Sequence, residues 1–156
     1  MSELFNSADI SAPEPIRIVM DSREDVNGRA LFCLSALHLC GPEIGRVSVV
    51  HALGPACAVM DVALEAFSWD VGVTVRKFAP HEAAAAFDAA YLYLSVSLGS
   101  VDEDWLKLSR RSGAKALVVS QFPDLLLKAD PILPARFAHD TRRFADLIMQ
   151  NLDMKS

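Results

Sequence analysis

Two polar loops contain the residue types that bind phosphate and sugar hydroxyl groups. The first loop, 21–29, reads Asp-Ser-Arg-Glu-Asp-Val-Asn-Gly-Arg and leads into a helical pattern. Guanidinium groups fork onto phosphate oxygens, and the free N–H groups of a helix N-terminus attract anions. One interpretation is that Arg23 and Arg29 hold an anionic ligand at this turn. The other is that both arginines are solvated and pair with Glu24 or Asp25.

The second loop, 95–104, reads Ser-Val-Ser-Leu-Gly-Ser-Val-Asp-Glu-Asp and again precedes a helical pattern. The small residues Ser97 and Gly99 allow a ligand to approach the backbone closely. The carboxylates of Asp102 and Glu103 can accept hydrogen bonds from ribose hydroxyls. Alternatively, these acidic residues cap the helix and compensate its macrodipole, which requires no ligand.

His51 ends a predicted strand and Gly54 lies three residues later, so the histidine side chain can face a ligand cleft. Other signatures are absent from the sequence. It contains no Gly-Lys-Ser/Thr phosphate loop, no GxGxxG and no Gly-x-Ser-x-Gly elbow. No set of His, Cys and Asp has the spacing of a metal site, so we expect no metal and assign no catalytic residue.

Strand-like and helix-like segments alternate from residue 16 onward. The β-rich runs are Ile16–Met20, Val47–His51, Val71–Val75, Ala90–Val96 and Ala116–Ser120. The helical patterns are Gly28–Leu39, Cys57–Trp69, His81–Ala89, Glu103–Ser112 and Thr141–Leu152. This alternation predicts an α/β fold, a single Rossmann-like parallel sheet with helices on both faces. Right-handed crossovers then bring the loops at the strands' carboxyl ends to one edge.

Three residues mark the expected ends of helices. Pro80 suits a first helical turn, Asp102 can cap the fourth helix, and Gly113 can end it in a left-handed conformation. Residues 1–15 contain two prolines and no periodic apolar pattern. We therefore expect a flexible leader or linker at 1–15 and one domain at 16–156.

The composition excludes several classes of protein. The 156 residues are 52% hydrophobic, with a mean hydropathy of +0.25, which fits a sheet covered on both faces and leaves room for an exposed apolar patch. A net charge of −5 argues against nucleic-acid binding through a general basic surface. No apolar run reaches about 18 residues and no signal peptide is evident, so we expect a cytoplasmic protein whose three cysteines are reduced and buried.

The order of several segments resembles the nucleotide-sugar-binding C-terminal domain of retaining GT-B glycosyltransferases. The segments that carry the resemblance are Ile16–Arg23 with Arg29, Val49–Pro55, Val73–Glu82, Phe87–Ser97, Gly113–Ser120 and Phe137–Asp140. The resemblance implies one half of a GT-B fold. It also implies a UDP- or GDP-sugar as donor, with Arg23 and Arg29 on the pyrophosphate. The backbone near Ser97 and Gly99 would then contact phosphate or sugar, and Asp102 or Glu103 the ribose.

The sequence departs from this family at its paired glutamates. Their expected positions fall near Val101 and Leu108, and neither residue is acidic. Arg29 stands in place of the family's lysine. The length fits only one Rossmann-like domain, so we expect the acceptor half of the fold to be missing from this chain. Independent catalysis is therefore not expected.

Two functions remain open after this comparison. The chain is either a nucleotide-sugar-binding half that needs a partner domain or subunit, or a non-catalytic, glycosyltransferase-like interaction and oligomerisation module. A receiver-type domain is a weaker alternative, because Lys77 stands near where the phosphoacceptor aspartate would be.

Overall fold

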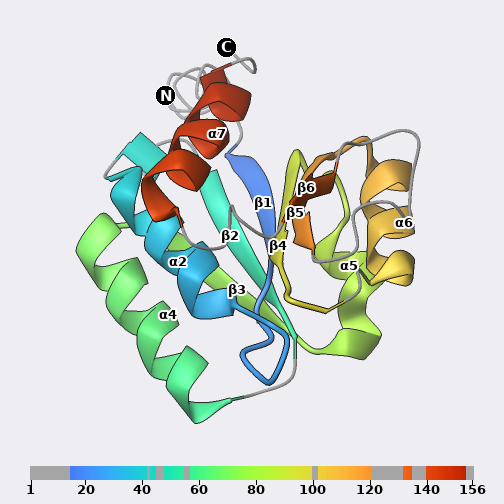
Figure 1. Ribbon diagram of the computed structural model, residues 1–156, viewed down its shortest axis with the longest axis horizontal. Helices are drawn as coiled ribbons and strands as arrows, with labels where there is room; N and C mark the ends of the chain where they lie inside the picture. The colour runs from blue at the N-terminus through green and yellow to red at the C-terminus, as the bar shows by residue number, and fades with distance from the viewer. Residues whose placement is uncertain are drawn as a thin grey trace, which may run out of the picture.

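A six-stranded, all-parallel sheet runs through the centre of the described part of the chain (Figure 1). The strands are β1 (Ile16–Asp21), β2 (Ser48–Leu53), β3 (Thr74–Phe78), β4 (Leu92–Val96), β5 (Lys115–Ser120) and β6 (Ile132–Pro134). Their spatial order is β3-β2-β1-β4-β5-β6. This computed structural model describes residues 15–41, 43–44, 48–54, 57–99, 102–120, 132–134 and 140–153.

The strand order defines one switch point in the sheet. The chain starts at the central strand β1, moves outward to β3, returns to β4 on the other side of β1, and then moves outward to β6. Connections therefore leave β1 and β4 in opposite directions, which opens a crevice at the carboxyl ends of these two strands. The predicted fold class, a Rossmann-like parallel α/β domain, is confirmed.

Helices cover both faces of the sheet (Figure 1). One face is covered by α2 (Ala30–Leu39), α4 (Ala58–Val71) and α7 (Thr141–Asp153). The other is covered by α5 (Ala83–Ala86), which follows the short helix η1 (Pro80–Glu82), and by α6 (Glu103–Ser112).

Successive strand residues point to opposite faces, because the side-chain period of a strand is two. Ile18 and Met20 of β1 are buried in the cluster beneath α2, α4 and α7, whereas Val19 between them joins the cluster beneath α5 and α6. In β4, Leu94 is buried beneath α2, α4 and α7, and Tyr93 beneath α5 and α6. Both faces are thus apolar, and this explains the high hydrophobic content.

Outside the middle of the chain the predicted boundaries agree with the structure to within two residues, although β6 was not predicted. The third strand was expected at Val71–Val75, but α4 continues to Val71, and β3 is Thr74–Phe78. Gly72 ends the helix in the left-handed conformation, with a φ of +79°. The strand can therefore begin only after this residue. The expected helix at His81–Ala89 is also wrong in length, because α5 stops at Ala86.

Other local predictions are confirmed. Pro80 opens η1, Asp102 caps α6 by accepting from the Trp105 N–H, and Gly113 ends α6 with a φ of +82°. The three cysteines form no disulfide; Cys33 is buried, whereas Cys40 and Cys57 are only half-buried.

Some predictions lie outside the described residues. The expected leader at 1–15 belongs to this group except for its last residue, and so do Val101 and most of the 137–140 segment. Among the described helices, none combines the length and apolar character required to cross a membrane.

Candidate functional site

The two polar loops predicted to carry chemistry meet at the carboxyl edge, beside the switch point. The Leu98 N–H donates to the Asn27 carbonyl at 2.8 Å, and Gly28 and Ser97 form an antiparallel bridge. The Arg29 N–H donates to the carbonyl of Val96 at 2.9 Å. Loops that are distant in the sequence are therefore held together by backbone hydrogen bonds.

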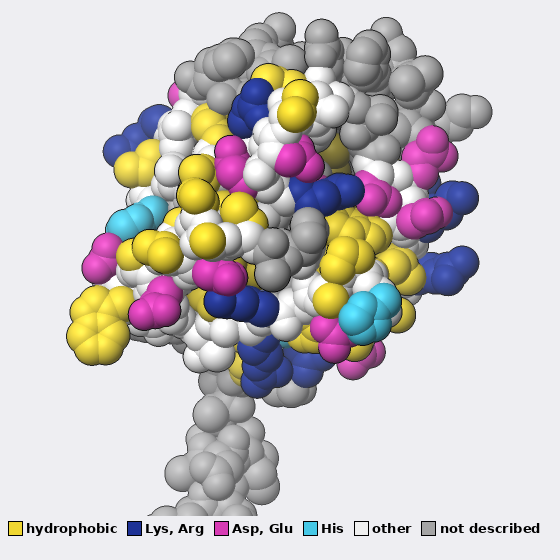
Figure 2. All heavy atoms as spheres, turned by 90° about the horizontal axis from the view of Figure 1, so that it is seen from below, with side chains coloured by type: hydrophobic (Ala, Val, Ile, Leu, Met, Phe, Trp, Pro, Cys, Tyr) yellow, Lys and Arg dark blue, Asp and Glu magenta, His cyan; other side chains and the backbone are white. Residues whose placement is uncertain are grey.

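A polar cavity of about 300 Å³ lies between these loops. It is lined by Asp21, Arg23, Asp25, Asn27, Gly28, Ser97 and Asp102. Of the eight residues predicted for the site, Arg23, Ser97 and Asp102 line this cavity. Figure 2 looks onto this edge from below and shows acidic and basic side chains interspersed on it.

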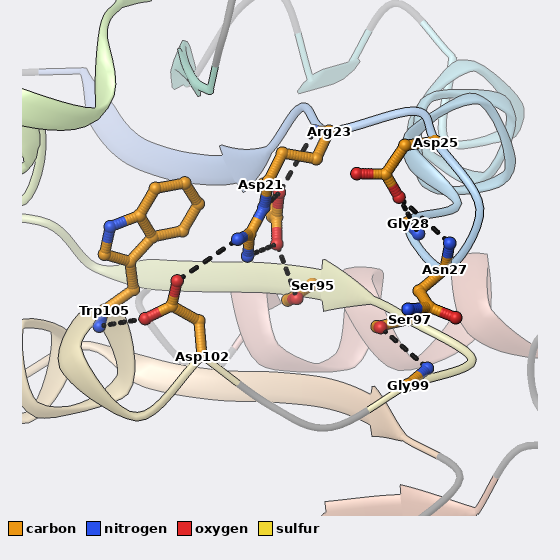
Figure 3. A network of polar contacts seen from close by, with 10 residues as sticks. All are labelled: Asp21, Arg23, Asp25, Asn27, Gly28, Ser95, Ser97, Gly99, Asp102 and Trp105. Carbon is orange, nitrogen blue, oxygen red and sulfur yellow. Dashed lines mark hydrogen bonds and ion pairs between the residues drawn. The ribbon is translucent and has the colours of Figure 1, made fainter.

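Asp21, at the end of β1, is the most buried acidic group of the cavity, with 6% of its side chain exposed. Arg23 holds it bidentately: Nε donates to one carboxylate oxygen at 3.0 Å and Nη2 to the other at 2.7 Å (Figure 3). The Arg23 backbone N–H and the Ser95 hydroxyl of β4 add two further hydrogen bonds, each at 3.1 Å. A desolvated carboxylate requires such partners, because burial disfavours its charged form.

Asp102 links the same arginine to helix α6 (Figure 3). One of its carboxylate oxygens accepts from Arg23 Nη1 at 3.2 Å, while the other accepts from the Trp105 N–H at 3.0 Å. The Arg23 guanidinium also lies over the indole of Trp105, 4.2 Å from the ring centre. Arg23 is thus fixed by two carboxylates and an aromatic face.

The charge balance of the cavity is negative. Three carboxylates line it, those of Asp21, Asp25 and Asp102, against the single guanidinium of Arg23. Hydrogen bonding to Asp21 raises the pKa of Arg23 above its ordinary value, against the opposing effect of burial. Such a lining favours hydroxyl and amino groups over phosphate, because an added anion meets uncompensated negative charge.

Carboxylates of the chain also occupy backbone N–H groups that an anion would use. Asp25 Oδ1 accepts from the N–H groups of Asn27 and Gly28 at 2.9 and 2.7 Å. These two hydrogen bonds lower the pKa of Asp25, and the bond from Gly28 has the larger effect. At the start of α2, Glu24 accepts from the Leu31 N–H at 2.8 Å.

Arg29 points back onto its own loop. Its Nη1 donates to the carbonyls of Asp25, Val26 and Gly28 at 3.0 to 3.2 Å. The expected alternative partners of the two arginines, the carboxylates of Glu24 and Asp25, are not the ones found. Arg23 pairs with Asp21 and Asp102, and Arg29 bonds to carbonyl oxygens.

The serine-glycine turn after β4 is packed against the first loop. The Ser97 hydroxyl accepts from the Gly99 N–H at 3.0 Å, and the Gly99 carbonyl accepts from Ser120 at 2.9 Å. A Cβ on Gly99 would lie 3.0 Å from the side-chain amide of Asn27. A larger residue at Gly99 would therefore have to displace the Asn27 side chain by a few tenths of an ångström.

His51 lies inside the protein, 2% exposed, and does not line the cavity. Its Nδ1 is 2.9 Å from the Ala86 carbonyl, and its ring packs against Phe78 with centres 4.7 Å apart. Burial lowers the pKa of His51, more than the hydrogen bond to Ala86 raises it. The residue is placed as a neutral core histidine.

This burial predicts a pH dependence of stability. The unfolded chain takes up a proton on His51 near pH 6.5, whereas the folded protein resists it. The free energy of unfolding should therefore decrease as the pH falls below about 6.5, by at most about 1.4 kcal/mol per pH unit. Urea denaturation at several pH values measures this dependence. The decrease in unfolding free energy below pH 6.5 should be smaller in His51→Gln than in wild type, and unchanged in His81→Gln, because His81 is exposed. Equal slopes in wild type and His51→Gln would contradict the prediction.

The remaining predicted residues lie apart from the cavity. Gly54 follows β2 and lines a separate cavity of about 200 Å³ with Ser22, Asp61 and Lys77. Glu103 is exposed in the first turn of α6. The cavity thus joins three of the eight predicted residues.

Sequence reasoning missed the roles of Asp21, Ser95 and Trp105. An acidic residue directly after an apolar strand was a signal for Asp21, since a carboxylate there must find a partner. Neither Ser95 nor Trp105 has a comparable signal, because their contacts depend on how β4 and α6 pack.

Comparisons with known proteins support the fold. No protein-family model matches the chain, and no curated protein matches it significantly. Among solved structures, the chain is similar to WaaG, a glycosyltransferase involved in lipopolysaccharide biosynthesis, with a TM-score of 0.56 and 12% sequence identity. The match covers 92% of this chain and 46% of that one, so the chain spans about half the length of this structural neighbour. At this identity the likeness shows the fold alone.

Proposed function

We propose that the chain is a glycosyltransferase-like domain that works as an interaction module and does not bind a sugar donor. The observation that carries this proposal is the occupation of the carboxyl edge by the chain's own carboxylates. The Asp25 carboxylate accepts hydrogen bonds from two backbone N–H groups of its loop. Asp102 accepts from the Trp105 N–H at the start of α6 and from Arg23 Nη1. Glu24 accepts from the Leu31 N–H of α2.

The proposal also follows from the balance of charge. A nucleotide diphosphate would have to displace Asp102 from Arg23 or Asp25 from the loop amides, and the displaced carboxylates would remain beside the phosphates. At 4 Å, two like charges near a protein surface repel by about 4 kcal/mol. Leu108 of α6, near an expected position of a paired glutamate, is a partly buried apolar side chain that packs against the core cluster beneath this helix.

A second candidate function is the binding of a UDP- or GDP-sugar through its hydroxyl groups. The cavity at the switch point favours it, because the acceptor oxygens of Asp102, Ser97 and Asn27 line the place where Rossmann-like sheets bind ligands. In this case Arg23 would contact a phosphate with the guanidinium N–H groups that Asp21 and Asp102 leave free.

Calorimetric titration separates the two candidates. We expect no heat of binding when wild-type protein is titrated with UDP, GDP, UDP-glucose or GDP-mannose. The double variant Asp25→Ala/Asp102→Ser should bind UDP at least about tenfold more tightly, because it removes two charges while serine keeps a cap on α6.

The matched control is Glu43→Gln/Asp146→Asn, which removes the same charge from exposed positions elsewhere. It should remain without binding. Micromolar binding of a nucleotide sugar by the wild-type protein would overturn the proposal and establish the second candidate. If the double variant gains no affinity for UDP, Asp25 and Asp102 are not what prevents nucleotide binding at the carboxyl edge of the sheet.

A further inference from the structure

A second cavity, of about 200 Å³, lies on the α4 side of the sheet. It forms where α4 begins beside the carboxyl ends of β1, β2 and β3 (Figure 1). Consecutive side chains of an extended chain point to opposite faces, so Ser22 lies on the same side as Met20, beneath α4. Asp21 lies on the other side with Val19. This cavity is thus separated by the sheet from the network around Asp21.

Ser22 supplies a buried hydroxyl that has no partner. The residue is 5% exposed and lines the cavity. Its N–H donates to the Leu53 carbonyl at 2.9 Å, but its hydroxyl forms no hydrogen bond within the described part of the chain. A buried hydroxyl without a partner costs free energy, because its bonds to water have been lost. Ser22 therefore retains hydrogen-bonding capacity for a bound molecule.

Gly54 leaves open the space that the Ser22 hydroxyl faces. A Cβ on Gly54 would lie 2.7 Å from Ser22 Oγ, closer than such atoms approach in proteins. The Gly54 N–H is already used, because it donates to the Phe78 carbonyl at 3.0 Å. Both Ser22 and Gly54 line the cavity, so the absence of a side chain at Gly54 gives a ligand access to the hydroxyl.

The rim of the cavity carries a lysine, an aspartate and the first turn of a helix. Lys77 Nζ lies 2.9 Å from Asp61 Oδ1, and both side chains are about half exposed. An ammonium group has three N–H donors, so this pair leaves donors of Lys77 available. Among the described residues no side chain caps α4, and the macrodipole adds about half a positive charge there. The balance suits a ligand with one negative charge and opposes one with two.

Most of the remaining lining is apolar. It includes Ala52, Met60, Leu64 and Ala79. Met60 and Leu64 are each 2% exposed, so they belong to the core and form the floor of the cavity. Sites for small molecules combine such walls with a few placed polar groups, and those for drug-sized ligands measure roughly 300 to 1,000 Å³. This smaller cavity suits a short hydrocarbon chain with one polar head.

We propose that the cavity binds a small aliphatic monocarboxylate. Its carboxylate accepts from the Ser22 hydroxyl and from Lys77 Nζ, and its hydrocarbon chain lies against Met60 and Leu64. Phosphate is disfavoured, because it carries more charge than the rim compensates and has no apolar part. None of these four residues lines the polar cavity between the two loops, so this site does not depend on the proposed function.

An NMR titration of the full chain with isovalerate tests the site. We expect a Kd of about 1 mM, with shifts at the amides of Ser22, Gly54 and Met60. Isovaleramide has the same shape without the charge and should bind at least about tenfold more weakly. Isopentylamine and inorganic phosphate should not bind. A Kd for isovalerate above about 10 mM would mean that water alone fills the cavity, and would overturn the site.

Two variants assign the polar contacts. Ser22→Ala should raise the Kd for isovalerate about tenfold, because it removes a hydrogen bond to a charged group. Its melting temperature should equal or exceed that of wild type, since the hydroxyl has no partner in the free protein. Lys77→Met should raise the Kd about fivefold. The matched controls Ser112→Ala and Lys107→Met, both on α6, should bind like wild type.

Several results would overturn the site. They are equal affinity for isovalerate and isovaleramide, an unchanged Kd in Ser22→Ala, and shifts confined to residues outside the cavity. Failure of isovalerate to bind leaves the proposed function intact, because that proposal rests on the carboxylates of the two loops. Binding of a nucleotide sugar overturns the proposed function, and leaves the carboxylate site intact if isovalerate still binds beside it.

Discussion

Arg23→Met should lower the free energy of unfolding by about 3 kcal/mol, the low end of the range for breaking a buried ion pair. Methionine retains an apolar stem over Trp105 but removes the guanidinium. Asp21, with 6% of its side chain exposed, then keeps only its bonds from the Arg23 N–H and the Ser95 hydroxyl. The measurement is urea denaturation followed by far-UV circular dichroism.

Two further variants separate charge from geometry at this position. Arg23→Lys should lose about 1 kcal/mol, because an ammonium group keeps the charge but not the bidentate fork. The double variant Asp21→Asn/Arg23→Met should lose less than the sum of the two single changes, since each single change leaves an uncompensated partner. Arg111→Met, on the exposed side of α6, should stay within about 0.5 kcal/mol of wild type. A loss in Arg23→Met no larger than this control would refute the role of the network.

Trp105→Ala should cost about 4 kcal/mol, as expected for removing a large buried aromatic side chain. Trp105 is 7% exposed, packs in the cluster beneath α5 and α6, and supports the Arg23 guanidinium from below. The change therefore removes core volume and also loosens the arginine that holds Asp21. Denaturation in guanidinium chloride measures the loss.

The second tryptophan provides the control for this experiment. Trp69 is 87% exposed, so Trp69→Ala should change stability by less than about 0.5 kcal/mol. Because the chain has only these two tryptophans, the fluorescence of Trp69→Ala comes from Trp105 alone. That emission should shift to the red on unfolding. A red-shifted emission in the native state would show that Trp105 is not buried.

The architecture could be predicted from the sequence because its signals are local. Apolar runs such as that of β1 alternate with helical periodicity, and Asp102 and Gly113 mark the ends of α6 by their own side-chain and backbone chemistry. β6 was missed because three residues, one of them Pro134, give too short a pattern. β3 was placed too early because Val71 and Val73 favour a strand, yet the helix continues until Gly72 ends it.

The site was harder to predict because its contacts are not local. The convergence of the two loops follows from the parallel topology and was expected. The partners of Arg23 were not, since Asp102 is 79 residues away and reaches it only after α6 has packed on the sheet. His51 looked like a ligand residue because it stands near a strand end, but its side chain is buried between β2 and α5, beside the Ala86 carbonyl.

The central position of β1 has a consequence for the order in which the chain acquires its structure. During synthesis β1 emerges before the other described strands, yet one of its two neighbours is β4, and the Asp21–Ser95 contact between them spans 74 residues. One edge of this apolar strand therefore stays uncovered until β4, more than 70 residues later, has been made. Such long-range pairing slows folding and exposes the nascent chain to aggregation. Ribosome-bound chains that stop before β4 should accordingly depend on chaperones, and those that include β5 should not.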